Sequence, residues 1–242
     1  MNYEIFNDTA AHYKFTNGTG ELVDAIAKYG GFDVELNTSV ASVQQSEAGV
    51  VVTTTNGYVV TAKRAVVTLP LNLLNNVSFD PPLSAAKQEA STLKHVGGGY
   101  KVFFEVEGDP GAVMTLSRSK DSSLIGSFTY KRGEQHSVLA GFSLESGALD
   151  KSVDEWQAVL EEFLPGVKLL STFGHDWGDD ALSQGSWCTY RPGTIARFAR
   201  PLPQQEGNLV FASGEHAQAW RGFIEGAIAS GSKAAIDLAD SL

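Results

Sequence analysis

Cysteine is almost absent from this sequence, because Cys188 is the single example among 242 residues. One cysteine excludes an internal disulfide and a cysteine-rich metal site, so we expect no metal and a reducing, cytoplasmic setting. Nothing in the sequence approaches the roughly 18 consecutive apolar residues of a membrane span. Residues 1–8 also lack the basic-then-apolar order of a secretion signal. These absences predict a protein that has no membrane partner.

Positive charge is also scarce, because 18 Lys and Arg stand against 28 Asp and Glu, for a formal net charge of −10. Nucleic-acid binding normally requires a basic face, so we expect no nucleic-acid partner. The acidity could attract a cationic substrate over long range, although it is more typical of a surface that keeps a protein dissolved. The 43% hydrophobic content and 25 glycines are those of a folded chain with one large or two small domains.

The first third of the chain alternates helix and strand signals. Residues 1–14 have no clear period and predict an N-terminal arm. A helix follows, with Thr19 as its expected N-cap. Strands are predicted at 33–36, 40–44, 50–54, 58–62 and 65–70. Asn56-Gly57 lies between two β-branched runs, which is a strong hairpin signal.

The middle of the chain has a different character. Pro81-Pro82 marks a boundary, and residues 83–93 predict a helix. From Gly97 onward, strands of antiparallel type are predicted at 100–106, 113–116, 124–129, 137–142 and 167–173, with an amphipathic helix at 154–164. The chain therefore predicts α/β structure, then a mostly antiparallel sheet, then a return to α/β.

The end of the chain carries the most informative stretch. Residues 209–212 predict a buried strand, and residues 223–242 predict a helix. Gly226 and Gly231 each cost about 1 kcal/mol in a helix interior, so they indicate close packing or a ligand. The loop between strand and helix aims backbone N–H groups and the positive end of the helix dipole at one spot. Such a loop favours a phosphate or an electron-rich carbonyl.

This stretch resembles the closing flavin-contacting segment of the flavin-dependent amine oxidases, the family of monoamine, polyamine and nicotine-type oxidases. The matching residues are Phe211-Ala-Ser-Gly-Glu215, Trp220-Arg-Gly-Phe-Ile-Glu-Gly-Ala227 and Ser230-Gly231. Further matches are Thr16-Asn-Gly-Thr-Gly-Glu-Leu-Val-Asp-Ala, Leu36-Asn-Thr-Ser-Val-Ala-Ser-Val, Val66-Val-Thr-Leu-Pro and Phe79-Asp-Pro-Pro-Leu. They occur in the family's order, so together they are far more specific than any one of them.

The resemblance implies the domain organisation and the cofactor. An FAD-binding region of the glutathione-reductase-like type would occupy residues 15–80 and 181–242, and a mixed, mostly antiparallel substrate-binding domain would occupy residues 81–180. The cofactor contacts implied are Val40, Trp177, Ser213, Gly214, Glu215, Trp220, Gly222, Phe223 and Ile224. The family's tethering cysteine falls on Ser186, so we expect noncovalent FAD. Ser213 departs from the usual glycine, which alters the expected loop backbone.

Three residues are implied for catalysis. Lys101 matches the lysine that holds a water near the flavin and assists reaction with oxygen, where a buried ammonium could stabilise developing negative charge. On an alternating strand it would otherwise be a solvated residue. Trp187 and Phe223 match the two walls of an aromatic substrate slot, which could stabilise a partly cationic amine. Without the family, Trp177 and Trp187 would be interpreted as core residues.

Complete members of the family open with a GxGxxG turn that binds the pyrophosphate, and no such motif occurs here. The chain is therefore expected to be the C-terminal-half subunit of a split amine oxidase, or a fragment of a longer one, and Met1 favours the subunit. Its partners would be a companion subunit with the dinucleotide-binding half and a small-molecule amine, oxidised to an imine while oxygen becomes hydrogen peroxide. The alternatives are an L-amino-acid oxidase subunit, with Arg191 or Arg221 as carboxylate ligand, and a non-catalytic binding or assembly subunit.

Overall fold

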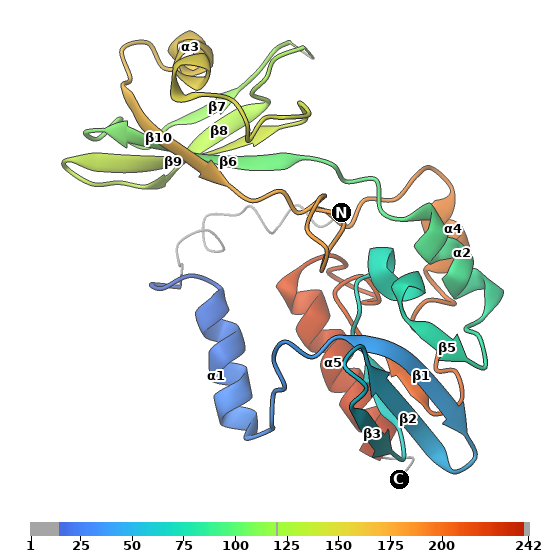
Figure 1. The fold of residues 1–242 in the computed structure, drawn as a ribbon. Helices are drawn as coiled ribbons and strands as arrows, with labels where there is room; N and C mark the ends of the chain where they lie inside the picture. The colour runs from blue at the N-terminus through green and yellow to red at the C-terminus, as the bar shows by residue number, and fades with distance from the viewer. Residues whose placement is uncertain (1–14, 120, 240–242) are drawn as a thin grey trace.

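The computed structural model describes residues 15–119 and 121–239, so the expected N-terminal arm at 1–14 lies outside the described residues. Figure 1 shows a five-stranded sheet with one helix at one end of the molecule and an α/β assembly at the other. Helix α1 (Gly20–Gly30) stands apart from both in this view. The fold class is confirmed, because similarly folded chains, reported below, share this mixture of sheets and helices.

Three strands of the α/β assembly form a meander. These are β1 (Val40–Ser46), β2 (Gly49–Thr54) and β3 (Val59–Ala62), and β5 (Ser78–Asp80) joins the free edge of β1 in parallel. The Asn56-Gly57 hairpin is confirmed, since β2 and β3 pair antiparallel and Gly57 has φ 85°. Val43 and Val50 face inward and pack on the rest of the assembly.

A two-stranded parallel sheet joins distant parts of the chain. Strand β4 (Ala65–Val67) pairs with β11 (Leu209–Phe211), and helix α5 (Ile224–Ala239) packs against β11 through Val210, Ala212 and Ala234. All three residues of β11 are buried. Parallel sheets normally have more strands and both faces covered. This pair therefore has the character of the centre of a larger sheet.

The five-stranded sheet forms the second body, in the order β10-β6-β9-β8-β7. Its strands are β6 (Tyr100–Glu107), β7 (Met114–Leu116), β8 (Gly126–Lys131), β9 (His136–Ser143) and β10 (Leu169–Gly174). Every neighbouring pair is antiparallel. Alternation along β6 buries Val102, Phe104 and Val106 against helix α3 (Val153–Phe163). Trp156 of α3 lies edge-on to Phe104 and donates its indole N–H to the carbonyl of Ala148 at 3.0 Å.

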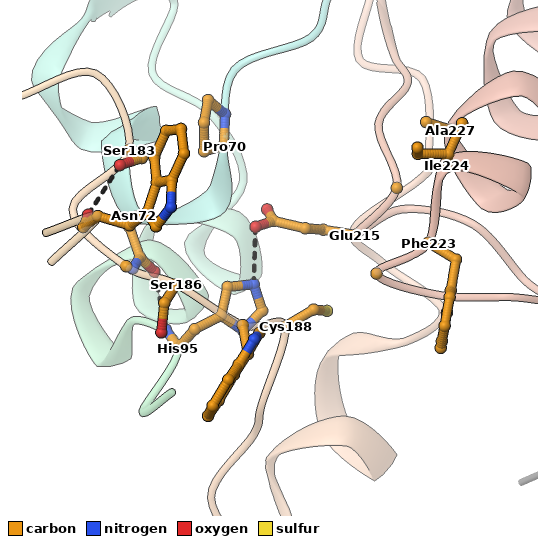
Figure 2. Close-up of a pocket in the computed structure, with 15 residues that line it drawn as sticks. Pro70, Asn72, His95, Ser183, Ser186, Cys188, Glu215, Phe223, Ile224 and Ala227 are labelled. Atoms are coloured by element: carbon orange, nitrogen blue, oxygen red, sulfur yellow. Dashed lines mark hydrogen bonds and ion pairs between the residues drawn. The ribbon is translucent and has the colours of Figure 1, made fainter. Parts of the chain in front are cut away.

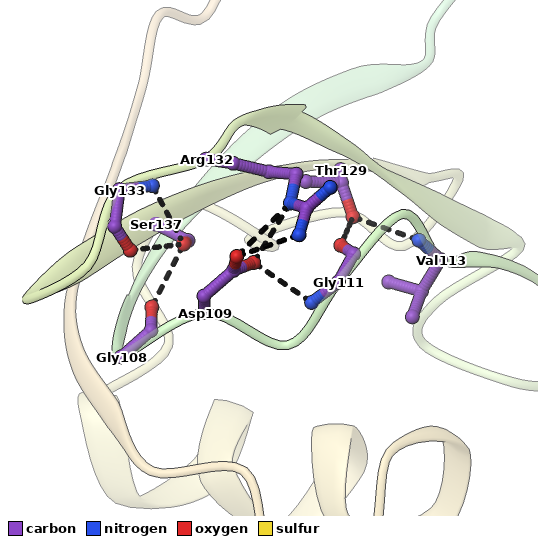
Figure 3. Close-up of polar contacts among 8 residues, drawn as sticks. All are labelled: Gly108, Asp109, Gly111, Val113, Thr129, Arg132, Gly133 and Ser137. Carbon is purple, nitrogen blue, oxygen red and sulfur yellow. Dashed lines mark hydrogen bonds and ion pairs between the residues drawn. The ribbon is translucent and has the colours of Figure 1, made fainter.

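Polar contacts link the turns at the end of this sheet where β6 ends, near Glu107 (Figure 3). Arg132 donates to both oxygens of Asp109, and the backbone N–H of Gly111 donates to the same carboxylate at 2.9 Å. The guanidinium of Arg132 holds the pKa of Asp109 below its ordinary value. Ser137 links two turns by donating to the carbonyls of Gly108 and Gly133. The opposite end of β6, at Tyr100 and Lys101, is therefore the end free to meet the rest of the chain.

The structure corrects several expectations about local elements. Residues 33–36 are irregular rather than a strand, because Val34 and Leu36 remain exposed and no described strand pairs with them. Thr19 occupies the N-cap position of α1, but its side chain makes no capping bond. The sequence reading also missed three short elements. These are the 3-10 helix η2 (Leu71–Asn76), strand β5, and helix α4 (Thr194–Phe198).

Helix α2 (Ala85–Leu93) ties the segment before β11 to the rest of the α/β assembly. Lys87 is fully buried in it and donates to the carbonyls of Pro201 and Gln204 and to the carboxylate of Glu206, at 2.8–3.0 Å. The ammonium also lies 4.3 Å from the centre of the Phe211 ring. No helix within the described residues has the length and apolar character needed to cross a membrane.

Candidate flavin site

Four segments far apart in the sequence enclose one pocket of about 420 Å³. They are the start of η2, the turn after α2, residues 177–188, and the loop and helix that follow β11 (Figure 2). The pocket lies where the α/β assembly meets the beginning of the five-stranded sheet. The lining residues are Pro70, Asn72, His95, Trp177, Ser183, Gly185, Ser186, Trp187, Cys188, Gly214, Glu215, Gly222, Phe223, Ile224 and Ala227.

The loop after β11 folds back on the start of α5. Gly222 donates its N–H to the carbonyl of Gly214 at 2.8 Å, and Ser230 of α5 donates to the carbonyl of Ser213 at 2.8 Å. Gly226 allows a close approach, because a Cβ there would lie 2.4 Å from the carbonyl oxygen of Trp220. By contrast, a Cβ on Gly231 would meet nothing within 4 Å. The predicted close packing therefore holds at Gly226 and not at Gly231.

Aromatic rings form the open side of the pocket. Trp187, Phe223 and Trp177 are 40%, 51% and 51% exposed, which is high for rings of this size. Trp187 is held from behind by Gly97 and Gly99, where a Cβ would collide with it at 2.5 Å and 2.1 Å. No other described residue covers the exposed faces of these rings. They therefore offer a flat apolar surface to a ligand.

The polar wall of the pocket contains residues that the sequence reading missed. Nε2 of His95 lies 3.0 Å from Oε1 of Glu215, an ion-pair contact without the alignment of a hydrogen bond. Asn72 accepts the backbone N–H of His95 at 2.7 Å and donates to the carbonyl of Gln184 at 2.7 Å. Neither residue carries a local signal, because only the fold brings His95 and Asn72 to Glu215.

The protonation of this wall follows from its contacts. Burial alone would lower the pKa of His95, but its contacts with Cys188 and Glu215 outweigh burial and raise that pKa to about 9. Burial alone would raise the pKa of Glu215, but His95 and the N–H of Leu71 lower it below its ordinary value. The wall therefore carries an imidazolium and a carboxylate at neutral pH.

The structure brings together six of the nine predicted cofactor residues and Trp187, which was predicted for catalysis. Trp177, Trp187, Gly214, Glu215, Gly222, Phe223 and Ile224 all line the pocket. Val40, Ser213 and Trp220 do not; Ser213 and Trp220 instead belong to the loop behind it, where the Oγ of Ser213 accepts the N–H of Glu215 at 3.1 Å.

Lys101 also lies outside the pocket lining. It is exposed on the face of the sheet opposite the buried Val102, and its ammonium lies 5.7 Å from the centre of the Phe142 ring. That ring is in turn 6.2 Å from Trp187. Lys101 is thus one aromatic ring away from the pocket wall.

The residues present fit the isoalloxazine part of a flavin better than its nucleotide part. Flat rings, glycines in close approach and the first turn of a 16-residue helix converge on the pocket. The GxGxxG turn that would hold the pyrophosphate is absent from the sequence. Ser186, at the family's tethering position, donates its hydroxyl to the carbonyl of Gly97 at 2.9 Å. Within the described residues, no group of three or more His, Cys, Asp or Glu could hold a metal ion.

The exposed rings and the glycine-rich loop make this pocket suited to a flat ligand. The family model for flavin containing amine oxidoreductases matches residues 2–239. The chain therefore belongs to that family, and the recognition made from the sequence is confirmed. FAD is the cofactor that follows from this membership.

Individual known proteins are similar to this chain over most of its length. The chain is 37% identical to a pseudooxynicotine dehydrogenase of a Pseudomonas species, an alignment that covers 100% of this chain and 49% of the relative. It is 30% identical to a nicotine dehydrogenase of Pseudomonas putida, over 96% of this chain and 48% of the relative. A putrescine oxidase bound to putrescine superposes with a TM-score of 0.81 at 21% identity, over 93% and 53% of the two chains. The chain thus spans about half the length of these relatives.

Proposed function

We propose that this chain is the C-terminal half of an FAD-dependent amine oxidase and works with a companion chain that carries the GxGxxG half. The observation that carries the proposal is the pocket, in which aromatic rings face a glycine-rich loop and a charged wall. The FAD is held without a covalent bond, since the tethering position is Ser186. The assembly acts in the cytoplasm, as the single cysteine suggests.

Two unfinished parts of the fold support a companion. The parallel pair β4–β11 extends to no further strand among the described residues, and its buried, strand-rich character suits the middle of a larger sheet. Helix α1 has no buried residue, although Val23 and Tyr29 are 67% and 96% exposed. Apolar helix faces normally pack on another element. A companion that adds strands beside β11 and covers α1 would complete both.

The proposed reaction is the two-electron oxidation of an amine. The amine loses a hydride equivalent from the carbon next to nitrogen and a proton from nitrogen, and the resulting imine is hydrolysed by water. Bound FAD supplies the electron acceptor, and oxygen then takes up two electrons and two protons to form hydrogen peroxide. Trp187 and Phe223, which are 40% and 51% exposed on the open side of the pocket, orient the amine for this reaction.

The relatives suggest which amines to assay first. Pseudooxynicotine and nicotine are named in the two matching dehydrogenases, and both compounds combine a basic nitrogen with an aromatic ring. An aromatic slot beside a carboxylate suits that chemistry. Because those relatives are called dehydrogenases, the assay should compare oxygen with an artificial electron acceptor.

No specific observation favours an L-amino-acid oxidase. Such an enzyme needs a free cation for the substrate carboxylate, and neither Arg191 nor Arg221 lines the pocket. Arg221 already donates to the carbonyl of Glu215 at 2.9 Å. A purely structural subunit would not require three exposed rings around one pocket.

Co-expression tests the proposal. With a companion that contains the dinucleotide-binding half, the chain should purify as a yellow complex that oxidises an aryl amine and releases hydrogen peroxide. Expressed alone, it should be colourless or poorly dissolved, because exposed apolar faces normally mark interfaces. If ultracentrifugation showed a flavin-loaded, active monomer of 25.8 kDa, the proposal that a companion chain is required would be wrong. A yellow complex that is inactive with amines and with both acceptors would overturn the oxidase activity.

A further inference from the structure

His95 lies at the junction of the segments that make the pocket. It follows helix α2 and precedes the glycines that lead into β6. Its side chain is only 3% exposed and points at Glu215 across the pocket wall (Figure 2). Its backbone is fixed by Asn72 at 2.7 Å, and its ring lies edge-on to Tyr190 with 4.7 Å between ring centres. The imidazole therefore has one orientation.

The Glu215 carboxylate is fixed from two sides. One oxygen accepts the backbone N–H of Leu71, and the other lies 3.0 Å from Nε2 of His95. The backbone of Glu215 is held as well, because Arg221 donates to its carbonyl and Ser213 accepts its N–H. Leu71 is a neutral donor, so His95 is the charged partner nearest to this carboxylate.

The remaining groups around the pair do not take over this role. Burial lowers the pKa of His216 to about 4, so that ring is neutral at pH 7. Burial raises the pKa of Tyr190 well above its ordinary value, so the phenol keeps its proton. Arg221 donates its hydrogen bond to the backbone carbonyl of Glu215 and not to the carboxylate. Cys188 interacts with the His95 imidazole and helps to raise its pKa, so its contribution has to be controlled separately.

We propose that His95 is a positioning residue that keeps the Glu215 carboxylate charged and fixed on the pocket wall, so that flavin is held tightly only while His95 is protonated. The inference rests on the proposed function, because it takes the pocket to be the flavin site. Without the imidazolium, a carboxylate that is mostly buried would lose its counter-charge, and it would then rotate or take up a proton.

The direction of the pH effect follows from the pKa of His95. That pKa is about 9 in the folded protein, against 6.5 for an ordinary histidine. A group whose pKa is raised by folding contributes stability that is fully present below its unfolded value and is lost as the pH rises through its folded value. The contribution of His95 should therefore be complete below about pH 6.5 and disappear around pH 9.

The test measures FAD affinity of the co-expressed complex by flavin fluorescence from pH 6 to pH 10. In the parent, affinity should fall about tenfold as the pH passes 9, which is the worth of one charge-assisted contact. His95→Gln should bind about tenfold more weakly at pH 7 and show no such fall. The two proteins should converge above pH 9. Glu215→Gln should also lose the pH dependence.

Two control variants isolate the pair. His136→Gln changes a histidine that is 56% exposed and lies 3.6 Å from Glu105 on the far end of β6, so it should leave the curve unchanged. Cys188→Ser removes one of the two contacts that raise the pKa of His95, so the fall in affinity should remain but move to a lower pH. A fall that persists in His95→Gln, or one that vanishes in Cys188→Ser alone, would overturn the assignment to His95.

A complex in which no variant binds flavin at any pH would overturn the proposed function, and the inference with it. Flavin binding with identical pH curves in parent and His95→Gln would leave the proposed function standing and overturn only the positioning role. The thermal midpoint of the flavin-free complex gives a readout that does not depend on cofactor. It should drop between pH 7 and pH 10 more in the parent than in His95→Gln.

Discussion

Replacing Gly99 by alanine gives a sharp test of the aromatic wall. A Cβ at this position would lie 2.1 Å from Cζ3 and 2.3 Å from Cη2 of Trp187, whereas ordinary contact begins at 3.4 Å. The indole must therefore retreat by about 1.3 Å, the difference between 3.4 Å and 2.1 Å. Because Trp187 is 40% exposed, it can move without unfolding the site.

The expected result is a loss of catalytic efficiency with little loss of stability. A displacement of about 1 Å can cost up to about 10²-fold when reacting groups must be aligned. We expect kcat/KM for an aryl amine to fall by about 10- to 10²-fold in Gly99→Ala. Flavin content and the urea midpoint should change little. Steady-state kinetics on the co-expressed complex, with the flavin absorbance as the active-site count, measures this.

The neighbouring glycine provides the control. A Cβ on Gly98 would meet nothing within 4 Å, and neither glycine has a positive φ. Gly98→Ala should therefore resemble the parent. The reasoning fails if Gly99→Ala keeps kcat/KM within about twofold of the parent, or if Gly98→Ala loses as much.

The remaining predictions concern stability, oxygen and cofactor attachment. Lys87→Met should cost about 3 kcal/mol in urea unfolding of the complex, because it leaves the Glu206 carboxylate and two carbonyls without their donor; a cost no larger than that of Lys233→Met, in an exposed pair, would contradict this. Lys101→Met should slow flavin reoxidation by oxygen about 10²-fold in stopped flow and change flavin reduction by substrate less. If both half-reactions of the variant kept the rates of the parent, Lys101 would have only a structural role. Acid precipitation should release FAD into the supernatant, since Ser186 occupies the tethering position; flavin in the pellet would refute noncovalent binding.

Much of the fold follows from local patterns. The Asn56-Gly57 turn fixes the hairpin of β2 and β3 because only small or turn-forming residues accept its backbone. The alternation of β6 and the apolar stripe of α3 likewise determine which side chains are buried. Residues 33–36 show the limit of such reasoning, since a strand requires a partner and none of the described strands supplies one.

Part of the candidate site could likewise be predicted from the sequence, and part of it could not. Its loop, its glycines and two of its tryptophans were found from the sequence, because chemistry and motif order mark them. Glu215 was found from its motif, but its pairing with His95 could not be found, since the two residues are far apart in the chain and His95 has no periodic or motif signal. Lys101 was placed on the correct kind of strand, but its distance from the pocket lining depends on how the sheet meets the α/β assembly. Local sequence thus determined the elements and the cofactor class, whereas only tertiary packing decided which charges face each other across the pocket.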